Sequence, residues 1–239
     1  MYNTVLIGLG RIASLNNKDQ VMLKNVKYAT HAQVLNTHGK YNWIAAVDKS
    51  PEACAYAKKT WGIEIVTNSI KQLNNRDNIQ IAVLATPPDS RLEILKYFPS
   101  LIGVVVEKPL GESYTSSAQF LDECKKRGIK VQVNLTRRSD AVMKQFASGN
   151  LNKRIGNIQF AFGSYGRGLH NYGIHLIDLV RMLIGEIVIV RSLSINEQYE
   201  KGPIENDFNF SFILETDNGV QVIMQPLDFS HYREGTLDI

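Results

Sequence analysis

The sequence predicts an α/β protein: a Rossmann-type parallel sheet at the N-terminus, followed by a smaller α+β domain with a mainly antiparallel sheet. In the first half, short apolar runs alternate with segments of helical period, which is typical of a parallel sheet covered on both faces. A glycine-rich turn follows the first of these runs directly. After about residue 135 the apolar runs lengthen, and an Asn-Gly step, a strong hairpin signal, joins two of them. We therefore divide the chain into domains over residues 1–134 and 135–239.

Six strands are expected in the first domain, and each is a short apolar run. They cover residues 4–7, 43–47, 63–66, 79–85, 103–107 and 130–134. Helices are expected over residues 51–61, 91–98 and 116–127. Ser50 and Pro51 are typical of an N-cap and a first helical position, and Gly128 is typical of a helix end.

Two helices and four strands are expected in the second domain. The helices cover about residues 140–147 and residues 172–184, and Gly185 ends the second of them. The strands cover about residues 158–162, then 187–195, 208–215 and 220–225. Asp217, Asn218 and Gly219 lie between the last two strands, which should therefore form a hairpin.

Composition narrows the possible partners. The formal charge is +4 and the basic residues are scattered, so we expect no nucleic-acid partner, although a mildly basic surface suits an anionic cofactor or substrate. Cys54 and Cys124 lie far apart in the sequence and do not have the spacing of metal ligands. We therefore expect neither a metal site nor a disulfide, and the reducing cytoplasm as the location. No apolar run approaches the roughly 20 residues that span a bilayer, and the chain enters a strand at once, so neither a membrane segment nor a signal peptide is expected.

The turn Gly8-Leu9-Gly10-Arg11-Ile12-Ala13 follows the first strand and has the pattern that binds a dinucleotide. Its first glycine allows the tight turn, its second lets the backbone approach a pyrophosphate, and a small third residue lets a helix pack closely. We expect Gly8, Gly10, Arg11, Ile12 and Ala13 to bind the cofactor; an ordinary glycine-rich turn is the alternative.

The acidic partner of this turn is expected about 20 residues further on. Asp48 ends the second strand but lies 35 residues after Ala13, and omitting a polar, turn-rich insertion at residues 14–29 leaves 19. The insertion is either a lid over the phosphate site or a passive surface loop. Asp48 should bind the adenosine ribose and favours NAD, whereas Lys49 could pair with a 2′-phosphate and keeps NADP possible.

Three further segments carry a family resemblance: Ala85-Thr86-Pro87-Pro88, Glu107-Lys108-Pro109 and Asn171-x-x-x-His175-x-x-Asp178. Together with the glycine-rich turn they are similar to the signatures of the glucose-fructose oxidoreductase/inositol dehydrogenase (Gfo/Idh/MocA) family. The resemblance runs from residue 4 to about residue 239, apart from the insertion. It implies an NAD(P)-dependent oxidoreductase that moves a hydride between nicotinamide and a carbinol carbon of a sugar, nucleotide sugar or cyclitol.

The resemblance also implies residue roles. Lys108 would be the catalytic lysine and His175 the general acid/base, while Glu107, Thr86 and Pro87 would lie along the cofactor; a cis Lys108–Pro109 bond is also implied. The residue chemistry agrees, because histidine takes a hydroxyl proton near neutral pH and a lysine at the carboxyl end of a parallel strand can stabilise an alkoxide. The structural alternatives are a solvated Lys-Pro turn, a buried structural histidine, and a local pair of His175 with Asp178.

Two departures from the family pattern affect the expected chemistry. Asn171 stands where the family has an aspartate that orients the imidazole and stabilises its charged form, and asparagine carries no charge. A non-catalytic NAD(P)-binding sensor or scaffold is therefore the alternative function. Arg91 stands where many relatives carry histidine, so we expect a different substrate pocket.

The C-terminal end bears on assembly. Similar proteins continue well beyond this point, so we expect either a short second domain or a fragment. The chain ends within an apparent strand, and an exposed strand invites pairing with another chain. We therefore expect a homo-oligomer, a dimer or tetramer, through the C-terminal sheet.

Overall fold

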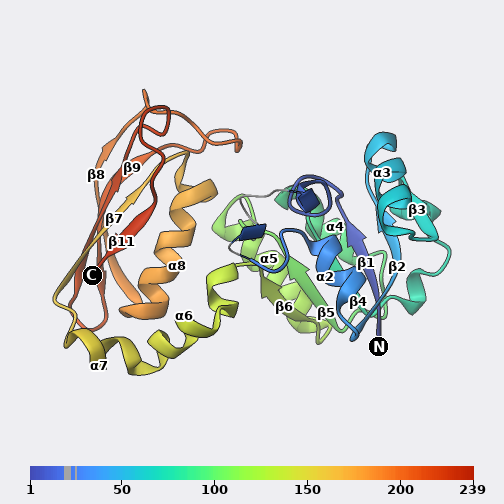
Figure 1. Cartoon of the computed structure of the whole chain (residues 1–239), viewed down its shortest axis with the longest axis horizontal. Helices are drawn as coiled ribbons and strands as arrows, with labels where there is room; N and C mark the ends of the chain where they lie inside the picture. Colours follow the sequence, from blue (N-terminus) through green and yellow to red (C-terminus); the bar gives the residue numbers. More distant parts are fainter. Residues whose placement is uncertain (19–22, 25) are drawn as a thin grey trace. The chain divides into compact units, whose positions relative to one another are not determined.

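The computed structural model describes residues 1–18, 23, 24 and 26–239, which form two compact units, Met1–Asn134 and Leu135–Ile239 (Figure 1). Each unit contains one sheet, a six-stranded sheet in the first and a five-stranded sheet in the second. Among the described residues, no helix has the length and apolar character needed to cross a bilayer. The predicted fold class is confirmed.

The first unit is built on a parallel sheet with the strand order β3-β2-β1-β4-β5-β6. Its strands are β1 (Tyr2–Ile7), β2 (Tyr41–Val47), β3 (Ile65–Thr67), β4 (Ile81–Leu84), β5 (Gly103–Val106) and β6 (Lys130–Val133). Its helices are α2 (His31–Thr37), α3 (Pro51–Trp61), α4 (Arg91–Leu95) and α5 (Tyr114–Lys126). Because the order runs in opposite directions on either side of β1 and β4, the sheet has a switch point between these strands, where such folds bind ligands.

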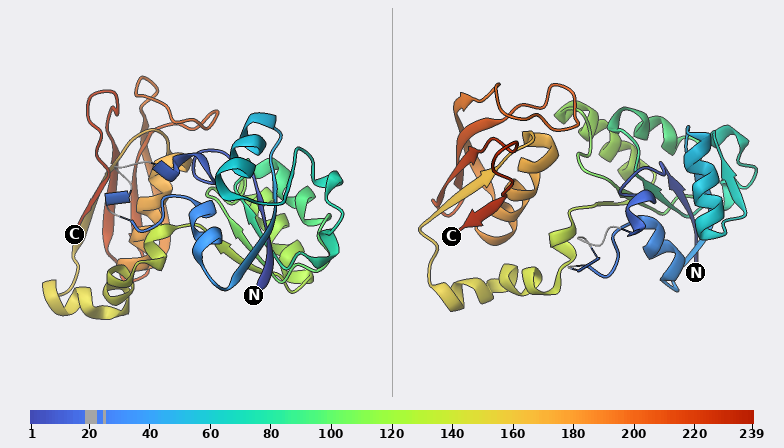
Figure 2. Two further views of the ribbon diagram at one scale, coloured as in Figure 1. Left: turned by 45° about the vertical axis from the view of Figure 1, so that its right-hand side comes forward. Right: turned by 45° about the horizontal axis from the view of Figure 1, so that its top comes forward.

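Alternate residues of β1 contribute to two buried clusters, one on each face of the sheet. Val5 and Ile7 share a cluster with Leu95 of α4 and with α5, whereas Leu6 shares the other with Leu35 of α2 and with α3. Both views of Figure 2 show helices on the two sides of this sheet. This burial explains why the strands are uninterrupted apolar runs.

Local capping sets the helix boundaries. Helix α3 has the predicted bounds: the Ser50 hydroxyl accepts a hydrogen bond from the Ala53 N–H, and Gly62 ends the helix with a φ of 66°. Sequence analysis did not predict α2, which is short and buries only two residues. A capping box of Thr30 and Gln33 begins this helix and was its one clear signal.

The inserted segment interrupts the helix that follows the glycine-rich turn. Ser14 N–H bonds to the Gly10 oxygen and starts a single helical turn. The N–H groups of His31 and Ala32 then bond to the oxygens of Ile12 and Ala13, so α2 continues that turn. Residues 19–22 and 25, within the predicted insertion at 14–29, lie outside the described residues. Both interpretations of the insertion, a lid and a surface loop, therefore stay predictions.

The second unit is a mixed sheet with the strand order β11-β7-β10-β9-β8. Its strands are β7 (Phe160–Tyr165), β8 (Ile187–Ile195), β9 (Phe210–Thr216), β10 (Gln221–Pro226) and β11 (Thr236–Asp238). All neighbours are antiparallel except β7 and β10. Helix α8 (Ile174–Leu183) lies along one face (Figure 1) and packs through Leu176, Leu179 and Val180. The predicted hairpin is confirmed, with Gly219 at a φ of 82°.

Three elements of this unit differ clearly from the predictions, while β9 and β10 are shifted by only one or two residues. The helix predicted over 140–147 is α6 (Ala141–Gln145), followed by a π-helical turn (Phe146–Asn150) and α7 (Leu151–Ile155). Gly149, with a φ of 94°, breaks the helical period there. The helix predicted over 172–184 begins earlier, as a π-helical turn (Leu169–Gly173), and the strand predicted over 158–162 is shifted to β7.

Candidate functional site

The glycine-rich turn is held between two strands. Gly8 has a φ of 87°, and a Cβ there would lie 2.5 Å from the Ala85 oxygen, so no other residue fits. Its N–H bonds to the Val47 oxygen of β2. At Gly10, by contrast, a Cβ would meet no atom of the described residues within 4 Å, its chain neighbours aside. The first glycine is therefore required by the protein, and the second leaves open space beside the backbone.

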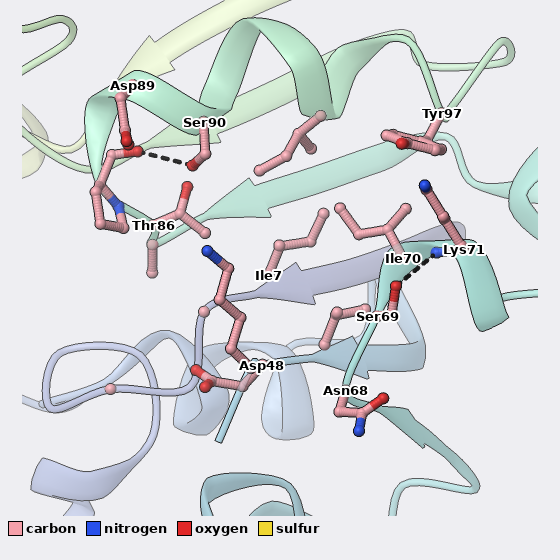
Figure 3. A pocket seen from close by; sticks show the side chains of 17 residues that line it. Ile7, Asp48, Asn68, Ser69, Ile70, Lys71, Thr86, Asp89, Ser90 and Tyr97 are labelled. Carbon is pink, nitrogen blue, oxygen red and sulfur yellow. Dashed lines mark hydrogen bonds between the residues drawn. The ribbon is translucent and has the colours of Figure 1, made fainter. Parts of the chain in front are cut away.

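A cavity of about 490 Å³ lies at the carboxyl ends of β1, β2 and β4, at the switch point of the sheet (Figure 3). It is lined by Ile7, Gly8, Gly10, Val47, Asp48, Lys49, Asn68, Ser69, Ile70, Lys71, Ala85, Thr86, Pro87, Asp89, Ser90, Ile94 and Tyr97. Of the predicted cofactor residues, the lining includes Gly8, Gly10, Asp48, Lys49, Thr86 and Pro87. It does not include Arg11, Ile12, Ala13, Glu107 or Lys108.

Sequence analysis missed the wall of this cavity that runs from Asn68 to Lys71. These residues follow β3, and parallel strands bring their carboxyl ends to one edge of the sheet. That placement was the available signal. Ser69 is fixed locally, because its hydroxyl accepts a hydrogen bond from the Lys71 N–H at 3.3 Å (Figure 3).

The Asp48 carboxylate is fixed at the rim of the cavity. One oxygen accepts a hydrogen bond from the Leu9 N–H at 2.6 Å, and the other accepts one from the Ser50 N–H at 2.8 Å. Each carboxylate oxygen has a second lone pair that can accept a ribose hydroxyl. Lys49 is exposed beside it.

Thr86 offers a second polar group on the β4 side of the cavity (Figure 3). Its hydroxyl oxygen is buried and has no hydrogen-bond partner among the described residues. A buried polar atom without a partner, on a cavity wall, is satisfied when a ligand brings its own polar edge. Together with Asp48 and the open space at Gly10, this atom fits a dinucleotide.

Glu107 follows β5 and connects three elements. Its Oε1 accepts hydrogen bonds from Nδ2 of Asn134 at 2.6 Å and from Nε2 of His31 at 2.7 Å. Burial alone would raise the pKa of Glu107, but these hydrogen bonds and the charges of His31 and Lys108 outweigh it and lower the pKa. The Lys108–Pro109 bond is cis, as the resemblance implied. Sequence analysis had no signal for His31, which lies 76 residues from Glu107.

Arg91, at the start of α4, is 2% exposed. Its Nε and Nη2 donate to the Thr86 oxygen at 3.2 and 2.8 Å, and its Nη1 donates to the oxygens of Pro109 and Leu110. Burial lowers its pKa to about 10. Arg91 is not among the residues that line this cavity, and its side chain binds main-chain oxygens. The expectation of a different substrate pocket stays a prediction.

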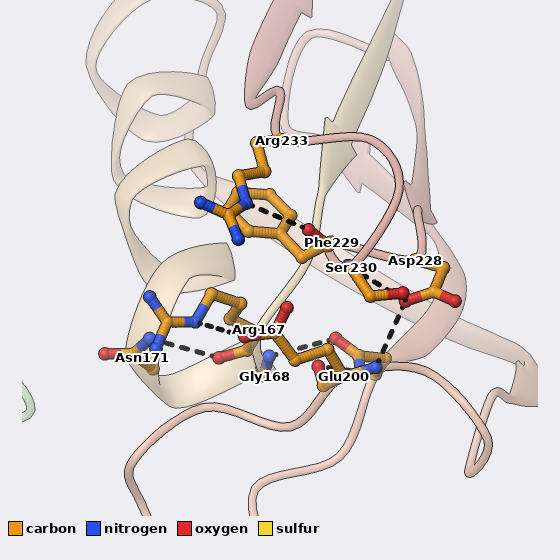
Figure 4. Close-up of polar contacts among 9 residues, drawn as sticks. Arg167, Gly168, Asn171, Glu200, Asp228, Phe229, Ser230 and Arg233 are labelled. Atoms are coloured by element: carbon orange, nitrogen blue, oxygen red, sulfur yellow. Dashed lines mark hydrogen bonds and ion pairs between the residues drawn. The ribbon is translucent and has the colours of Figure 1, made fainter.

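In the second unit, Asn171 lies on the π-helical turn before α8. Its Nδ2 donates to the Arg167 oxygen at 3.1 Å (Figure 4). Arg167 has a φ of 58°, an uncommon conformation for a residue with a side chain. An ionised aspartate could not make this bond, because it has no donor. Asn171 therefore stabilises the bend that leads into the helix.

A buried carboxylate caps this turn. Asp207 is 2% exposed, and its two oxygens accept hydrogen bonds from the N–H groups of His170 and Asn171, each at 2.8 Å. Acidic groups stabilise a helix start because its N–H groups have no partner within the helix. Sequence analysis did not predict a role for Asp207, which is 36 residues from Asn171 in the chain.

His175 lies on the first turn of α8, and the Tyr172 ring meets its ring edge-on at 6.2 Å. Phe229 packs on Tyr172 in turn, with the ring centres 5.5 Å apart. Asp178 accepts a hydrogen bond from Nε of Arg138 at 2.6 Å. The nearest acidic neighbour of His175 in sequence is thus already paired. No group of three or more His, Cys, Asp and Glu in the described part of the chain could hold a metal ion.

The parallel sheet, the glycine-rich turn and the cavity at the switch point define a dinucleotide-binding Rossmann domain. Sequence profiles of known families agree. Residues 2–135 match the oxidoreductase family described as "NAD-binding Rossmann fold", and residues 146–239 match the "GFO/IDH/MocA C-terminal domain". The chain belongs to the Gfo/Idh/MocA oxidoreductase family, and its first unit is an NAD-binding domain.

Solved structures show the same fold. The WlbA dehydrogenase from Bordetella pertussis, in complex with NADH and UDP-GlcNAcA, has a TM-score of 0.76 and 20% identity, over 98% of this chain and 74% of that one. The scyllo-inositol dehydrogenase from Lactobacillus casei, with NAD(H) and scyllo-inositol, has a TM-score of 0.73 and 17% identity, over 99% and 72%. An oxidoreductase from Agrobacterium radiobacter, with NAD+, L-tartaric acid and magnesium, has 0.73 and 17%, over 99% and 70%. Comparison with curated protein sequences gave no match.

Proposed function

We propose that the protein is an NAD(P)-dependent oxidoreductase that transfers a hydride between nicotinamide and a carbinol or carbonyl carbon of a sugar, nucleotide sugar or cyclitol. The observation that carries this proposal is the position of Lys108. It follows β5, which pairs with β4, and the loop after β4 supplies Thr86 and Pro87 to the cavity. A cationic side chain therefore follows a strand at the edge of the sheet where a dinucleotide fits.

The cofactor would lie along this edge. Gly8, Gly10, Arg11, Ile12 and Ala13 would hold the pyrophosphate, since Gly10 leaves open space at the turn. Asp48 would accept the adenosine ribose hydroxyls, and Lys49 would tolerate a 2′-phosphate. Thr86, Pro87 and Glu107 would lie nearer the nicotinamide, which supplies the hydride acceptor or donor when bound.

Two residues would act on the substrate, and a third would position one of them. The Lys108 ammonium would stabilise the oxygen of the reacting carbon as negative charge develops there. His175 would take the hydroxyl proton during oxidation and return it during reduction. Asn171 would position the His175 helix through its bond to the Arg167 oxygen, without the negative charge that an aspartate would add.

Incubating the purified protein with NAD+ or NADP+ and a panel of inositols, aldoses and nucleotide sugars tests this proposal. We expect a rise in NAD(P)H absorbance with one class, and a loss of about 100-fold or more in Lys108→Ala and His175→Ala. Lys96→Ala is the matched control, because Lys96 is exposed and forms a local surface pair with Glu93. Unchanged turnover in both site variants would refute the assigned roles.

The second candidate is a non-catalytic NAD(P)-binding sensor or scaffold. The amide of Asn171, in place of a carboxylate, favours it, because an amide cannot supply the negative charge that would stabilise a protonated imidazole. It predicts that NADH binds, which a change in NADH fluorescence would detect, while no member of the panel is oxidised or reduced. Any alcohol-dependent formation of NADH would exclude it.

We also propose a homo-oligomer formed through the C-terminal sheet. Strand β8 is at the edge of that sheet and exposes the apolar side chains of Val188, Val190, Leu193 and Ile195. Sedimentation of the wild type and of Val190→Asp tests this; an oligomer that the variant leaves intact would refute it. Location in the cytoplasm also stays a prediction.

A further inference from the structure

Arg91 is a buried cation whose hydrogen bonds go to main-chain oxygens. With 2% exposure it has lost nearly all contact with water, which is costly for a charged group unless its donors are satisfied. All three guanidinium nitrogens donate, in four contacts: two to the Thr86 oxygen and one each to the oxygens of Pro109 and Leu110. The planar fork of the guanidinium is suited to such a set of acceptors.

These oxygens belong to two different loops. Thr86 follows β4 and lines the cavity, whereas Pro109 and Leu110 follow β5 directly after Lys108. One side chain thus joins the loop that would contact the cofactor to the loop that carries the lysine. A displacement of either loop would break hydrogen bonds of a buried charge.

The residue on the other side of Lys108 is also fixed. Glu107 is bound by His31 of α2 and by Asn134 after β6. Lys108 therefore lies between Glu107, which is hydrogen-bonded to α2 and to the end of β6, and Pro109, which Arg91 connects to the loop after β4. Arg91 is the connection that reaches the cavity.

We propose that Arg91 is a positioning residue, which sets the place of Lys108 relative to the cofactor loop by binding the main-chain oxygens of Thr86, Pro109 and Leu110. In its link to catalysis this inference rests on the proposed function. Lysine cannot replace arginine in this role, because an ammonium concentrates its donors at one point and cannot span the two loops. Histidine has at most two ring donors.

Arg127 supplies a matched control. Its guanidinium also donates to main-chain oxygens, those of Leu95 and Phe98, and it also joins two elements, α5 and the end of α4. It follows α5 and contacts the end of α4, whereas Arg91 begins α4, so the two arginines act at opposite ends of that helix. Arg127→Lys removes the same kind of bond from a place away from Lys108.

The first measurement needs neither cofactor nor substrate. Trinitrobenzenesulfonate labels lysines, and mass spectrometry gives the rate at Lys108 relative to the exposed Lys96 in the same sample. We expect Arg91→Lys to change this ratio by at least about threefold and Arg127→Lys to leave it unchanged. An unchanged ratio in folded Arg91→Lys would overturn the proposal. Thermal unfolding checks folding, and if Arg91→Lys is unfolded, Arg91→Gln is measured in its place, with the same expected and overturning results.

The second measurement is a double-mutant cycle on turnover with the substrate found by the panel. Arg91→Lys should lower kcat about 10- to 100-fold while the KM for NAD changes less, because misplacing the lysine affects the reaction more than binding. In a Lys108→Met background the same change should cost little more. If Arg91→Lys lowers kcat by the same factor in the wild type and in Lys108→Met, the proposal is overturned. If the wild type turns over no substrate but the labelling ratio changes, the proposed function fails and the positioning of Lys108 by Arg91 stands.

Discussion

The two units fix their candidate catalytic residues with buried charges of opposite sign. In the first, the cation Arg91 binds main-chain oxygens at the ends of two strands. In the second, the anion Asp207 binds main-chain N–H groups at the start of a helix. Each charged side chain is 2% exposed. The cation faces carbonyl oxygens, which carry partial negative charge, and the anion faces N–H groups, which carry partial positive charge. Backbone dipoles can therefore satisfy a buried charge, and the loop that supplies them is held in return.

The largest effect should follow from removing the buried anion. Asp207→Ala leaves the N–H groups of His170 and Asn171 without acceptors, at a cost of about 3 kcal/mol in local stability. Hydrogen exchange by mass spectrometry should show these amides exchanging about 100-fold faster. Both tryptophans, Trp43 and Trp61, lie in the first unit, so their fluorescence transition should not move. Glu205→Ala, an exposed position in the same loop, is the control; equal exchange in the two variants would contradict the comparison.

Glu107→Gln tests the first unit and has a defined pH dependence. The pKa of Glu107 is lowered in the folded state, since hydrogen bonds and the charges of His31 and Lys108 outweigh the burial that would raise it. Such a carboxylate stabilises the fold above its unfolded pKa, and this contribution is lost as the pH falls through the folded value. We expect Glu107→Gln to cost about 2 kcal/mol at neutral pH, by urea unfolding followed with tryptophan fluorescence.

The difference between wild type and Glu107→Gln should shrink in acid, below the ordinary glutamate value of 4.5. Glu93→Gln provides the control, because Glu93 is exposed and forms a local surface pair. A difference that stays constant from neutral pH into acid would show that the charge of Glu107 contributes nothing.

A smaller effect is expected from restoring the family's carboxylate. Asn171→Asp removes the donor to the Arg167 oxygen and places a carboxylate beside that oxygen, which should cost about 1 kcal/mol. Faster hydrogen exchange around residues 167–171 would show it. A tenfold or greater gain in turnover with unchanged exchange would mean that the chain had lost a catalytic group, and that Asn171 has no structural role.

The smallest effect on stability should come from Gly10→Ala. Among the described residues, a Cβ at Gly10 meets no atom within 4 Å other than those of its chain neighbours, so the free energy of unfolding should change by less than about 0.5 kcal/mol. NADH should nevertheless bind at least about tenfold more weakly, because the methyl group fills the space predicted for the pyrophosphate. Gly39→Ala, with equally open surroundings but outside the cavity, should change neither quantity. Unchanged affinity in Gly10→Ala would place the cofactor elsewhere.

Sequence patterns were informative where structure depends on near neighbours. The bounds of α3 follow from Ser50, Pro51 and Gly62, and the hairpin follows from its Asn-Gly step. The bounds of β8 match the predicted strand, a stretch rich in isoleucine and valine that is interrupted by Arg191, Ser192 and Ser194. The glycine-rich turn and the motif around Lys108 also came from short stretches, so the edge of the sheet that carries the candidate site could be predicted.

The supporting contacts could not be predicted, because they join residues far apart in the chain. His31 meets Glu107 across 76 residues, and Asp207 meets Asn171 across 36. Arg91 meets Pro109 across 18, through a main-chain oxygen that any residue would provide. No periodicity or spacing encodes such pairs, since they form only when the strands and helices have taken their places.

The interrupted helix after Gly10 has a consequence for engineering. His31 and Ala32 bond to Ile12 and Ala13, so the chain leaves and re-enters this helix at adjacent points. A segment whose two ends already meet can change length at small entropic cost, about 0.6 kcal/mol for each doubling. The junction is thus a suitable site for inserting a peptide. A peptide tag inserted there would lie next to the glycine-rich turn, and the hydrogen bonds that join the two parts of the helix would be kept.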